Sequence, residues 1–402
     1  MKPSTLPYPL LGEADLSGKR VLLRAGFDVP ITDGKVTDTS RIDALVPTMQ
    51  HILQNAASLV IMAHQGRPKD TPDPLFSQKP LVEVLQRLLK ADVAFADSCT
   101  GDTALAAAKA LKPGQVLLLE NLRFDAREKK NDPVFAKELA ALADIYVDDA
   151  FTNCHRSHAS MVGVPQHLPS YMGLNLEQEV RHLTAVTEHP EHPVTLIISG
   201  AKMETKIPVI AYFSDKGDDV LVGGCIANTF IAAQGNAMGK SKFEEKWTQR
   251  CTELMNESKQ EGRAKICVPC DGVVAVQPTE IAEKSNRFVD DIAPDSAIYD
   301  LGQETVDRFI SIIEKSRTII WNGPLGLYEI PQFSQATRGI AEAVAAACKR
   351  GATAILGGGD TIDFHTRYGM PLDAYTYVST GGGAMLEFIG GGELPALKAL
   401  RK

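Results

Sequence analysis

The chain has 402 residues, of which 44% are hydrophobic and 23% charged, a composition typical of a globular protein with a substantial buried core. This composition excludes disordered and fibrous proteins. The formal net charge of −8 excludes an overall positive field that would attract nucleic acid or an anionic membrane. We therefore expect small-molecule partners, and any anion among them must contact a local basic cluster.

The cysteines and the start of the chain indicate a reducing compartment. Seven cysteines, an odd number in a long chain, do not form a disulfide framework, so we expect a cytoplasmic protein. Residues 1–20 are interrupted by Pro3, Pro7, Pro9 and Glu13 and resemble neither a signal peptide nor a membrane anchor. No later segment approaches the roughly 18 apolar residues that a membrane span needs.

Short apolar runs rich in β-branched residues alternate along the chain with longer helix-like segments. This alternation is typical of parallel sheets covered by helices on both faces. Helices are expected, for example, at 80–90, 102–111, 228–234 and 337–350. The predicted strands, in chain order, are 21–27, 58–64, 92–97, 116–121, 145–151, 194–200, 219–224, 265–269, 318–323, 352–358 and 374–379.

These strands fall into two successive α/β sets, which predict two doubly wound lobes. A (β/α)₈ barrel is the competing architecture, but the strands outnumber the eight that such a barrel holds. The boundary is expected near 171–191, where a charged, helix-compatible run at 176–188 is typical of a connecting helix.

In the first half, the residues that follow the predicted strands are cationic or can donate hydrogen bonds. Ligands of open α/β sheets bind beyond the carboxyl ends of the strands, and guanidinium groups match phosphates and carboxylates. One arginine alone is usually a surface residue, and one histidine is as often structural as functional. Their recurrence predicts an anion receptor, formed by Arg24, Arg41, His64, Arg67, Arg123, His155, Arg156 and His158.

In the second half, the same positions are rich in glycine. Glycine lets backbone N–H groups approach a phosphate, and a following helix adds its positive N-terminal end. A single glycine-rich turn would indicate only a tight connection, but several on one sheet edge predict a nucleotide site. The glycine-rich segments are 199–202, 223–224, 322–326, 357–361 and 380–383.

Three charged residues accompany these turns. Lys202 and Lys206 are four residues apart at the start of a predicted helix, where both ammonium groups can face adjacent phosphates. Asp360 follows three glycines and suits either a Mg²⁺ ligand, completed by substrate phosphates, or a helix N-cap. Neither the dinucleotide-binding G-x-G-x-x-G nor the G-x-S-x-G nucleophile turn is present, which disfavours dehydrogenases and hydrolases.

Taken together, the motifs resemble those of the phosphoglycerate kinase family over nearly the whole chain. The order and spacing of the motifs make this resemblance specific. The segments that carry it are 120–124 (ENLRF), 155–163 (HRSHASMVG), 321–324 (WNGP), 357–361 (GGGDT) and 379–384 (STGGGA).

The resemblance implies an N-terminal phosphoglycerate-binding domain (1–172), a connecting helix (173–190) and a C-terminal nucleotide-binding domain (191–386). It also implies a hinge that closes the cleft, and a tail (387–402) that returns to the first domain. Arg41 and Lys202 would be catalytic and meet the moving phosphoryl group. The implied phosphoglycerate ligands are Gly26, Phe27, Asp28, Arg41, His64, Gln65, Gly66, Arg67, Arg123 and Arg156.

The same resemblance implies that ADP or ATP binds to the second domain with Mg²⁺ near Asp360 and the adenine against Pro324. Gly381, Gly382 and Gly383 would cradle phosphate. The other implied nucleotide-binding residues are Gly200, Ala201, Lys206, Gly224, Asn322, Glu329, Gly358, Gly359 and Thr361.

Several positions depart from the family pattern. After Arg24 the family usually has Asp and Asn where this chain has Gly26 and Asp28. Gly26 lacks the expected carboxylate, and Asp28 places a negative charge where a neutral amide is usual. Gln65 replaces a usual Leu, and two further replacements are Thr205 for Asp and Ala293 for Gly.

The expected activity is reversible, Mg²⁺-dependent transfer of the acyl phosphate of 1,3-bisphosphoglycerate to ADP, in glycolysis and gluconeogenesis. We expect the chain to act as a monomer. Two alternatives stay open at this point: a related kinase for another phosphorylated carboxylate, which Gly26 and Asp28 favour, and a catalytically silent nucleotide sensor or scaffold.

Overall fold

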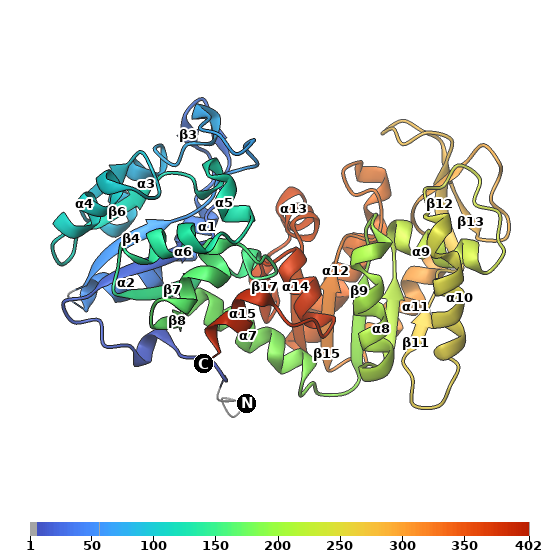
Figure 1. Ribbon diagram of the computed structural model, residues 1–402. Helices are drawn as coiled ribbons and strands as arrows, with labels where there is room; N and C mark the ends of the chain where they lie inside the picture. Colours follow the sequence, from blue (N-terminus) through green and yellow to red (C-terminus); the bar gives the residue numbers. More distant parts are fainter. Residues whose placement is uncertain (1–5, 56, 402) are drawn as a thin grey trace. The chain divides into compact units, whose positions relative to one another are not determined.

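The computed structural model describes residues 6–55 and 57–401, and the predicted start of the first domain, residues 1–5, lies outside them (Figure 1). The chain divides into two compact units. Unit 1 comprises the residues up to Arg181 together with those from Glu393, and unit 2 comprises His182–Gly392. The division falls inside α7 (Leu174–Thr187).

Within the described residues, unit 1 contains a six-stranded parallel sheet in the order β5-β6-β4-β1-β7-β8. Both faces of the central strands are buried, which explains their continuous apolar sequences. In the register, Leu22 of β1 lies opposite Val60 of β4 and Tyr146 of β7. The strands are β1 (Arg20–Ala25), β4 (Ser58–Met62), β5 (Val93–Ala96), β6 (Val116–Leu119), β7 (Ile145–Asp149) and β8 (Ser170–Met172).

The helices expected at 80–90 and 102–111 are present in unit 1. In α3 (Leu81–Leu89), Leu81, Leu85 and Leu89 repeat every four residues and are all buried, and Lys90 ends the helix in a left-handed conformation with φ 53°. The other helices are α1 (Ser40–Asp43), α2 (Val46–Gln54), α4 (Asp102–Ala110), α5 (Ala126–Lys129), α6 (Pro133–Ala140) and α15 (Pro395–Leu400). A short hairpin consists of β2 (Ile31–Thr32) and β3 (Lys35–Val36).

Unit 2 contains a second six-stranded parallel sheet among its described residues, in the order β11-β10-β9-β15-β16-β17. The strands are β9 (Val194–Ile198), β10 (Asp219–Val222), β11 (Lys265–Cys267), β15 (Thr318–Asn322), β16 (Thr353–Gly357) and β17 (Tyr377–Ser379). The helices are α8 (Ile207–Lys216), α9 (Gly224–Ala233), α10 (Thr248–Glu257), α11 (Gln303–Ile313), α12 (Gln335–Lys349), α13 (Gly359–Arg367) and α14 (Gly383–Ile389).

The predicted architecture of two parallel-sheet lobes is confirmed, and two open sheets replace the barrel alternative. Sequence reasoning missed β8 and an antiparallel sheet in unit 2 with the order β13-β12-β14. Its strands are β12 (Asp271–Ala275), β13 (Lys284–Phe288) and β14 (Ala297–Leu301). No helix in the described part of the chain combines the length and apolarity needed to cross a membrane.

Candidate active site

The sheet order places one candidate site in each unit. In unit 1 the chain leaves β1 toward β4 on one side and later adds β7 on the other side, so the loops after these strands diverge at a topological switch point. In unit 2, β9 is flanked by β10 and β15 in the same way. The cationic residues of unit 1 and the glycine turns of unit 2 lie at these strand ends.

Arg24, near the end of β1, is the buried centre of the unit 1 site, with 1% of its surface exposed. Its Nε donates to Ser160 Oγ at 3.0 Å, and its Nη2 lies 3.2 Å from His64 Nδ1. Ser160 in turn donates from its backbone N and its Oγ to the buried Glu128 carboxylate, at 2.9 and 2.6 Å. Because a guanidinium can only donate, His64 Nδ1 accepts and the neutral ring carries its proton on Nε2.

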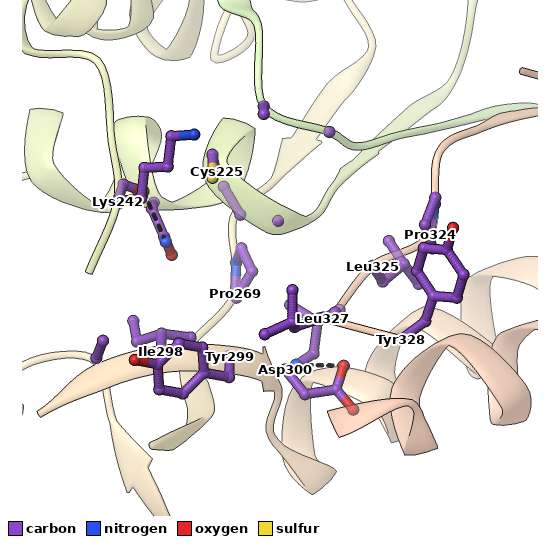
Figure 2. Close-up of a pocket in the computed structure, with 18 of the residues that line it drawn as sticks. Cys225, Lys242, Pro269, Ile298, Tyr299, Asp300, Pro324, Leu325, Leu327 and Tyr328 are labelled. Carbon is purple, nitrogen blue, oxygen red and sulfur yellow. Dashed lines mark hydrogen bonds between the residues drawn. The ribbon is translucent and has the colours of Figure 1, made fainter. Parts of the chain in front are cut away.

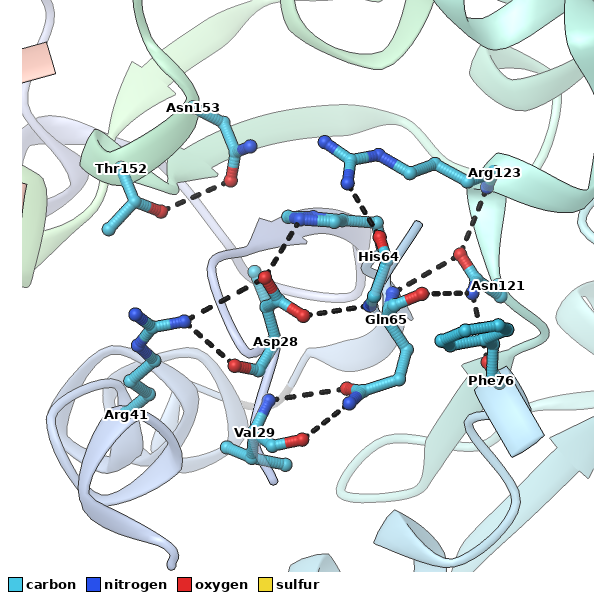
Figure 3. A network of polar contacts seen from close by, with 12 residues as sticks. Asp28, Val29, Arg41, His64, Gln65, Phe76, Asn121, Arg123, Thr152 and Asn153 are labelled. Carbon is cyan, nitrogen blue, oxygen red and sulfur yellow. Dashed lines mark hydrogen bonds and ion pairs between the residues drawn. The ribbon is translucent and has the colours of Figure 1, made fainter. Parts of the chain in front are cut away.

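Figure 3 shows four further predicted residues, Arg41, His64, Gln65 and Arg123, in a polar network with Asp28. The backbone N of Gly66 donates to Asp28 Oδ1 at 2.8 Å, and His64 Nε2 lies 3.5 Å from Asp28 Oδ2. Arg41 Nη1 donates to the Asp28 carbonyl oxygen at 2.7 Å and lies 3.8 Å from Oδ2. Arg123 Nη1 donates to the Gly66 carbonyl oxygen at 2.7 Å. The structure thus brings Asp28, Arg41, His64, Gly66 and Arg123 into one network.

Two other predicted arginines are exposed, and two predicted residues contribute no accessible side chain. Arg67 and Arg156 are exposed. The pKa of Arg123 is lowered mainly by burial and by the Arg24 charge, and the nearby Arg156 charge lowers it further. Phe27 is fully buried in the core of unit 1. At Gly26, an added Cβ would lie 3.2 Å from Ala150 Cα, so this position has little room for a side chain.

Three histidines of unit 1, His64, His155 and His158, are held neutral. Burial lowers the pKa of His64 to about 4, and the Arg24 and Arg123 charges add to this effect while Asp28 opposes it. Burial followed by the Arg156 charge lowers the pKa of His155 to about 4, and burial followed by the arginine charges does the same for His158. At neutral pH these rings therefore act as hydrogen-bond donors and acceptors without charge.

In unit 2, a cavity of about 440 Å³ opens beside the carboxyl ends of the strands (Figure 2). This volume lies in the range of small-molecule sites. The predicted residues that line it are Gly200, Ala201, Gly224, Pro324, Glu329 and Asp360.

A buried network joins the remaining turns of unit 2. Lys206, 8% exposed, donates from Nζ to Asn322 Oδ1, and Asn322 Nδ2 donates to the Gly357 carbonyl oxygen at 2.8 Å. Thr361 Oγ1 accepts from the Gly323 N–H at 2.9 Å. Gly358 precedes α13 with φ 101°, and an added Cβ would lie 2.9 Å from Asn322 Nδ2, so both the backbone and the space require glycine.

The other predicted residues of unit 2 lie outside this network. Lys202 is exposed at the start of a short 3₁₀ turn (Met203–Thr205), and Gly359 is exposed at the start of α13. The Gly381 N–H donates to Ser379 Oγ at 3.1 Å, Gly382 precedes α14 with φ 50°, and Gly383 begins that helix.

The carboxylate available in unit 2 fits a metal ion whose remaining coordination positions are filled by substrate phosphates. Among the described residues, no group of three or more His, Cys, Asp and Glu side chains is arranged to hold a metal. Asp360 is an exposed carboxylate in the first turn of α13, on the cavity wall. Mg²⁺ usually takes one or two carboxylates and fills its other positions with phosphates and water, so Asp360 suits such a role.

Sequence reasoning missed several residues of both sites. In unit 1 these are Asn121, Glu128 and Ser160, buried polar residues far from Arg24 in the chain. In unit 2 they are cavity-lining residues, among them Ile298 and Tyr299 on the unpredicted strand β14. The β-branched and aromatic residues of 297–301 were the available signal for that strand. Further missed lining residues are Cys225, Lys242, Pro269, Asp300, Leu325, Leu327 and Tyr328.

Comparison with known proteins gives consistent matches over nearly the whole chain. The profile of the phosphoglycerate kinase family matches residues 11–392. A phosphoglycerate kinase of Finegoldia magna is 42% identical over 97% of this chain and 98% of that protein, and one of Chloroflexus aurantiacus is 42% identical over the same shares. The crystal structure of phosphoglycerate kinase from Pyrococcus horikoshii superposes with a TM-score of 0.84 at 32% identity, covering 98% of each chain. The structure of the Coxiella burnetii enzyme superposes with a TM-score of 0.89 at 35% identity, covering 98% of this chain and 99% of that one.

Proposed function

The chain belongs to the phosphoglycerate kinase family, and we propose that its two units bind the two substrates separately. The enzyme is a phosphotransferase with a carboxyl group as acceptor, which interconverts 1,3-bisphosphoglycerate and ADP with 3-phosphoglycerate and ATP. A related kinase or a silent sensor is not favoured by these relatives. The observation that carries our proposal is the contrast between the cationic network of unit 1 and the glycine-lined cavity of unit 2.

Unit 1 is suited to phosphoglycerate because its cations lie at one sheet edge. Arg41, Arg67 and Arg156 are at least partly exposed and can contact a phosphate or carboxylate bidentately. His64 adds a neutral N–H donor in a fixed orientation, because Arg24 holds the opposite ring nitrogen. We propose that these residues, with Arg123, bind the phosphoglycerate.

Unit 2 is suited to a nucleotide because a partly apolar cavity lies beside phosphate-binding turns. Pro324 and the residues of β14 would contact the base, while Lys206 and the Gly358–Thr361 turn at the start of α13 would contact the phosphates. Mg²⁺ held by Asp360 would neutralise charge on the nucleotide phosphates.

We propose that transfer needs positioning and charge stabilisation without a general base. A carboxylate of 3-phosphoglycerate is already a competent nucleophile, so no proton has to be removed before attack. Lys202 is exposed, and Arg41, although its Nη1 contacts Asp28, keeps 43% of its side chain exposed, so each cation presents charge that can stabilise the phosphoryl group in transit. Cations fixed where charge develops are an effective means of stabilising such a transition state.

The test compares Arg67→Ala with Lys202→Ala in a coupled assay with 3-phosphoglycerate and Mg-ATP. Arg67→Ala removes one anion-binding charge and should raise the KM for 3-phosphoglycerate by about tenfold, with the KM for ATP changed by less than about twofold. Lys202→Ala should lower kcat by at least about a hundredfold, because a preorganised electrostatic donor is lost, with a smaller change in nucleotide binding.

Arg87→Ala is the matched control. Arg87 is an exposed arginine in the last turn of α3, which leads into the start of β5 at the opposite end of the sheet. Its removal should leave both KM values unchanged. An increase in the KM for ATP alone in Arg67→Ala would reverse the assignment of substrates to units, and near-normal turnover in Lys202→Ala would remove that residue from the mechanism.

We further propose that the enzyme acts in the cytoplasm, as a monomer. All seven cysteines, each within the described residues, are free thiols, which suits a reducing compartment. Each unit carries its own substrate-binding residues on the same chain, so no second copy is needed. Sedimentation analysis at assay concentrations checks the monomer, and an active dimer that loses activity on dissociation would contradict it.

A further inference from the structure

The anion-binding donors of unit 1 already face an anion that belongs to the chain itself. The Asp28 carboxylate accepts from the Gly66 N–H at 2.8 Å, and its Oδ2 lies 3.5 Å from His64 Nε2 and 3.8 Å from Arg41 Nη1. Its side chain is 35% exposed, so it faces the same solvent space that a bound substrate would enter. Three donors suited to a phosphate or carboxylate are therefore engaged internally.

Gln65 fixes this carboxylate in place. Its side-chain amide bonds both backbone groups of Val29: the Val29 N–H donates to Gln65 Oε1 at 3.2 Å, and Gln65 Nε2 donates to the Val29 carbonyl oxygen. The backbone of Gln65 is itself bonded on both sides by the Asn121 amide, at 3.2 and 2.7 Å. Figure 3 shows these paired bonds beside Asp28. The loop that carries Asp28 is thus clamped to the end of β4.

The backbone at position 28 suits a short polar side chain, and the neighbouring position 26 does not. Asp28 has φ 42°, a left-handed conformation that Asp and Asn tolerate better than other side chains. At Gly26, an added Cβ would lie 3.2 Å from Ala150 Cα and 3.4 Å from Thr152 Oγ1. The loop therefore admits an acidic side chain at 28 and has little room for one at 26.

We propose that Asp28 is a tethered carboxylate that sets the affinity for phosphoglycerate by competing with the substrate for Arg41, His64 Nε2–H and the Gly66 N–H. The proposal rests on the assignment of phosphoglycerate to unit 1. An incoming anion must displace Asp28 from these donors or bind beside its negative charge, and either step costs free energy. Gln65 is the positioning residue, because it holds the Asp28 loop against the donors.

The test is Asp28→Asn, which keeps the shape, the acceptor for Gly66 and the tolerance of positive φ while removing the charge. We expect the KM for 3-phosphoglycerate to fall at least about fivefold, with the KM for ATP unchanged within about twofold. The inhibition constant of inorganic sulfate, measured against 3-phosphoglycerate, should fall in parallel. Asp33→Asn is the matched control, because Asp33 is an exposed acidic residue with φ 51° in the β2–β3 turn.

Gln65→Leu tests the clamp. It should also lower the KM for 3-phosphoglycerate when Asp28 is present, and have no further effect on this KM in the Asp28→Asn background. If Gln65→Leu instead acted by loosening the fold independently of Asp28, it would change the KM by the same factor in both backgrounds. An unchanged or raised KM in Asp28→Asn overturns the proposal. Arg67→Ala is measured in the same assay. If Arg67→Ala raises the KM for 3-phosphoglycerate and Asp28→Asn leaves it unchanged, this inference alone is overturned. If neither variant changes that KM, the assignment of phosphoglycerate to unit 1 is overturned.

Discussion

Lys206 in unit 2 shows how burial prepares a single residue for an anionic ligand. Burial lowers the pKa of its ammonium group to about 8, and the Asp360 charge partly opposes this effect. The ammonium group already donates to Asn322, yet its charge is incompletely compensated in its buried position. A nucleotide phosphate would stabilise the charged form, so phosphate binding and protonation of Lys206 should favour each other.

We predict that this coupling makes nucleotide affinity fall above about pH 8. As pH rises through the pKa, Lys206 loses the proton that attracts phosphate, so the Kd for Mg-ATP should rise by up to about tenfold per pH unit. Lys206→Met should bind Mg-ATP about tenfold or more weakly at pH 7 and show a flatter profile between pH 7 and 9. Titration calorimetry of both proteins measures this difference, and parallel profiles would show that Lys206 is not the group that titrates.

At this scale, the sequence reveals charged residues after apolar strands more readily than it reveals their partners. Arg41, His64 and Arg123 could be predicted as neighbours because parallel strands end at one sheet edge. Ser160 and Glu128 could not, because they are buried polar residues that meet Arg24 only through tertiary structure. Nor did the sequence indicate that Asp28 would face Arg41, since that contact depends on the left-handed backbone conformation of Asp28.

At the scale of elements, the parallel strands were predictable because they are buried on both faces and therefore continuously apolar. The antiparallel strands of unit 2 were not, and β13 explains why. All five of its residues, Lys284–Phe288, are exposed, so the strand lacks the alternation of buried and exposed residues that would distinguish it from a loop. β8 has only three residues, too few for a periodic signal.

The end of β7 carries two consecutive buried acids, which predict an unusual pH dependence of stability. Burial raises the pKa of Asp148 to about 7, partly offset by the Ala150 N–H and the Arg24 charge. With the folded-state pKa above the unfolded one, stability is highest at low pH for this group and is lost as pH rises toward 7. Asp148→Asn should therefore increase the free energy of unfolding at pH 8, by about 1 to 3 kcal/mol, and have little effect near pH 4.

Urea unfolding of both proteins at pH 4, 6 and 8 measures this difference. Asn keeps an oxygen that can accept from the Ala150 N–H, so the comparison isolates the charge. A pH-independent difference would mean that packing, and not ionisation of Asp148, determines the result. His64, His155 and His158 act in the opposite sense, because their folded-state pKa values near 4 reduce stability below about pH 6.5. Their contribution cancels between the two proteins.

At the scale of the whole molecule, the chain passes from unit 1 to unit 2 and then returns. The returning segment begins at Glu393, and α15 packs on unit 1 through buried side chains such as Leu397 and Leu400. Arg401 Nη2 also donates to the phenolic Oη of Tyr8 at 3.1 Å. A general two-lobe arrangement could be inferred from the strand count, but the residue where the chain changes units depends on contacts far apart in sequence.

We predict that Leu400→Ala destabilises unit 1 selectively. Leu400 is fully buried at the end of α15, and truncating such a leucine costs about 2 to 5 kcal/mol. Both tryptophans, Trp247 and Trp321, belong to unit 2, so their fluorescence reports unfolding of that unit while far-UV circular dichroism reports both. In Leu400→Ala, the dichroism transition should broaden toward lower denaturant with the fluorescence midpoint unchanged. The matched control Leu386→Ala, in α14 of unit 2, should lower the fluorescence midpoint. If both variants shift both signals equally, the two units unfold as one and the prediction is wrong.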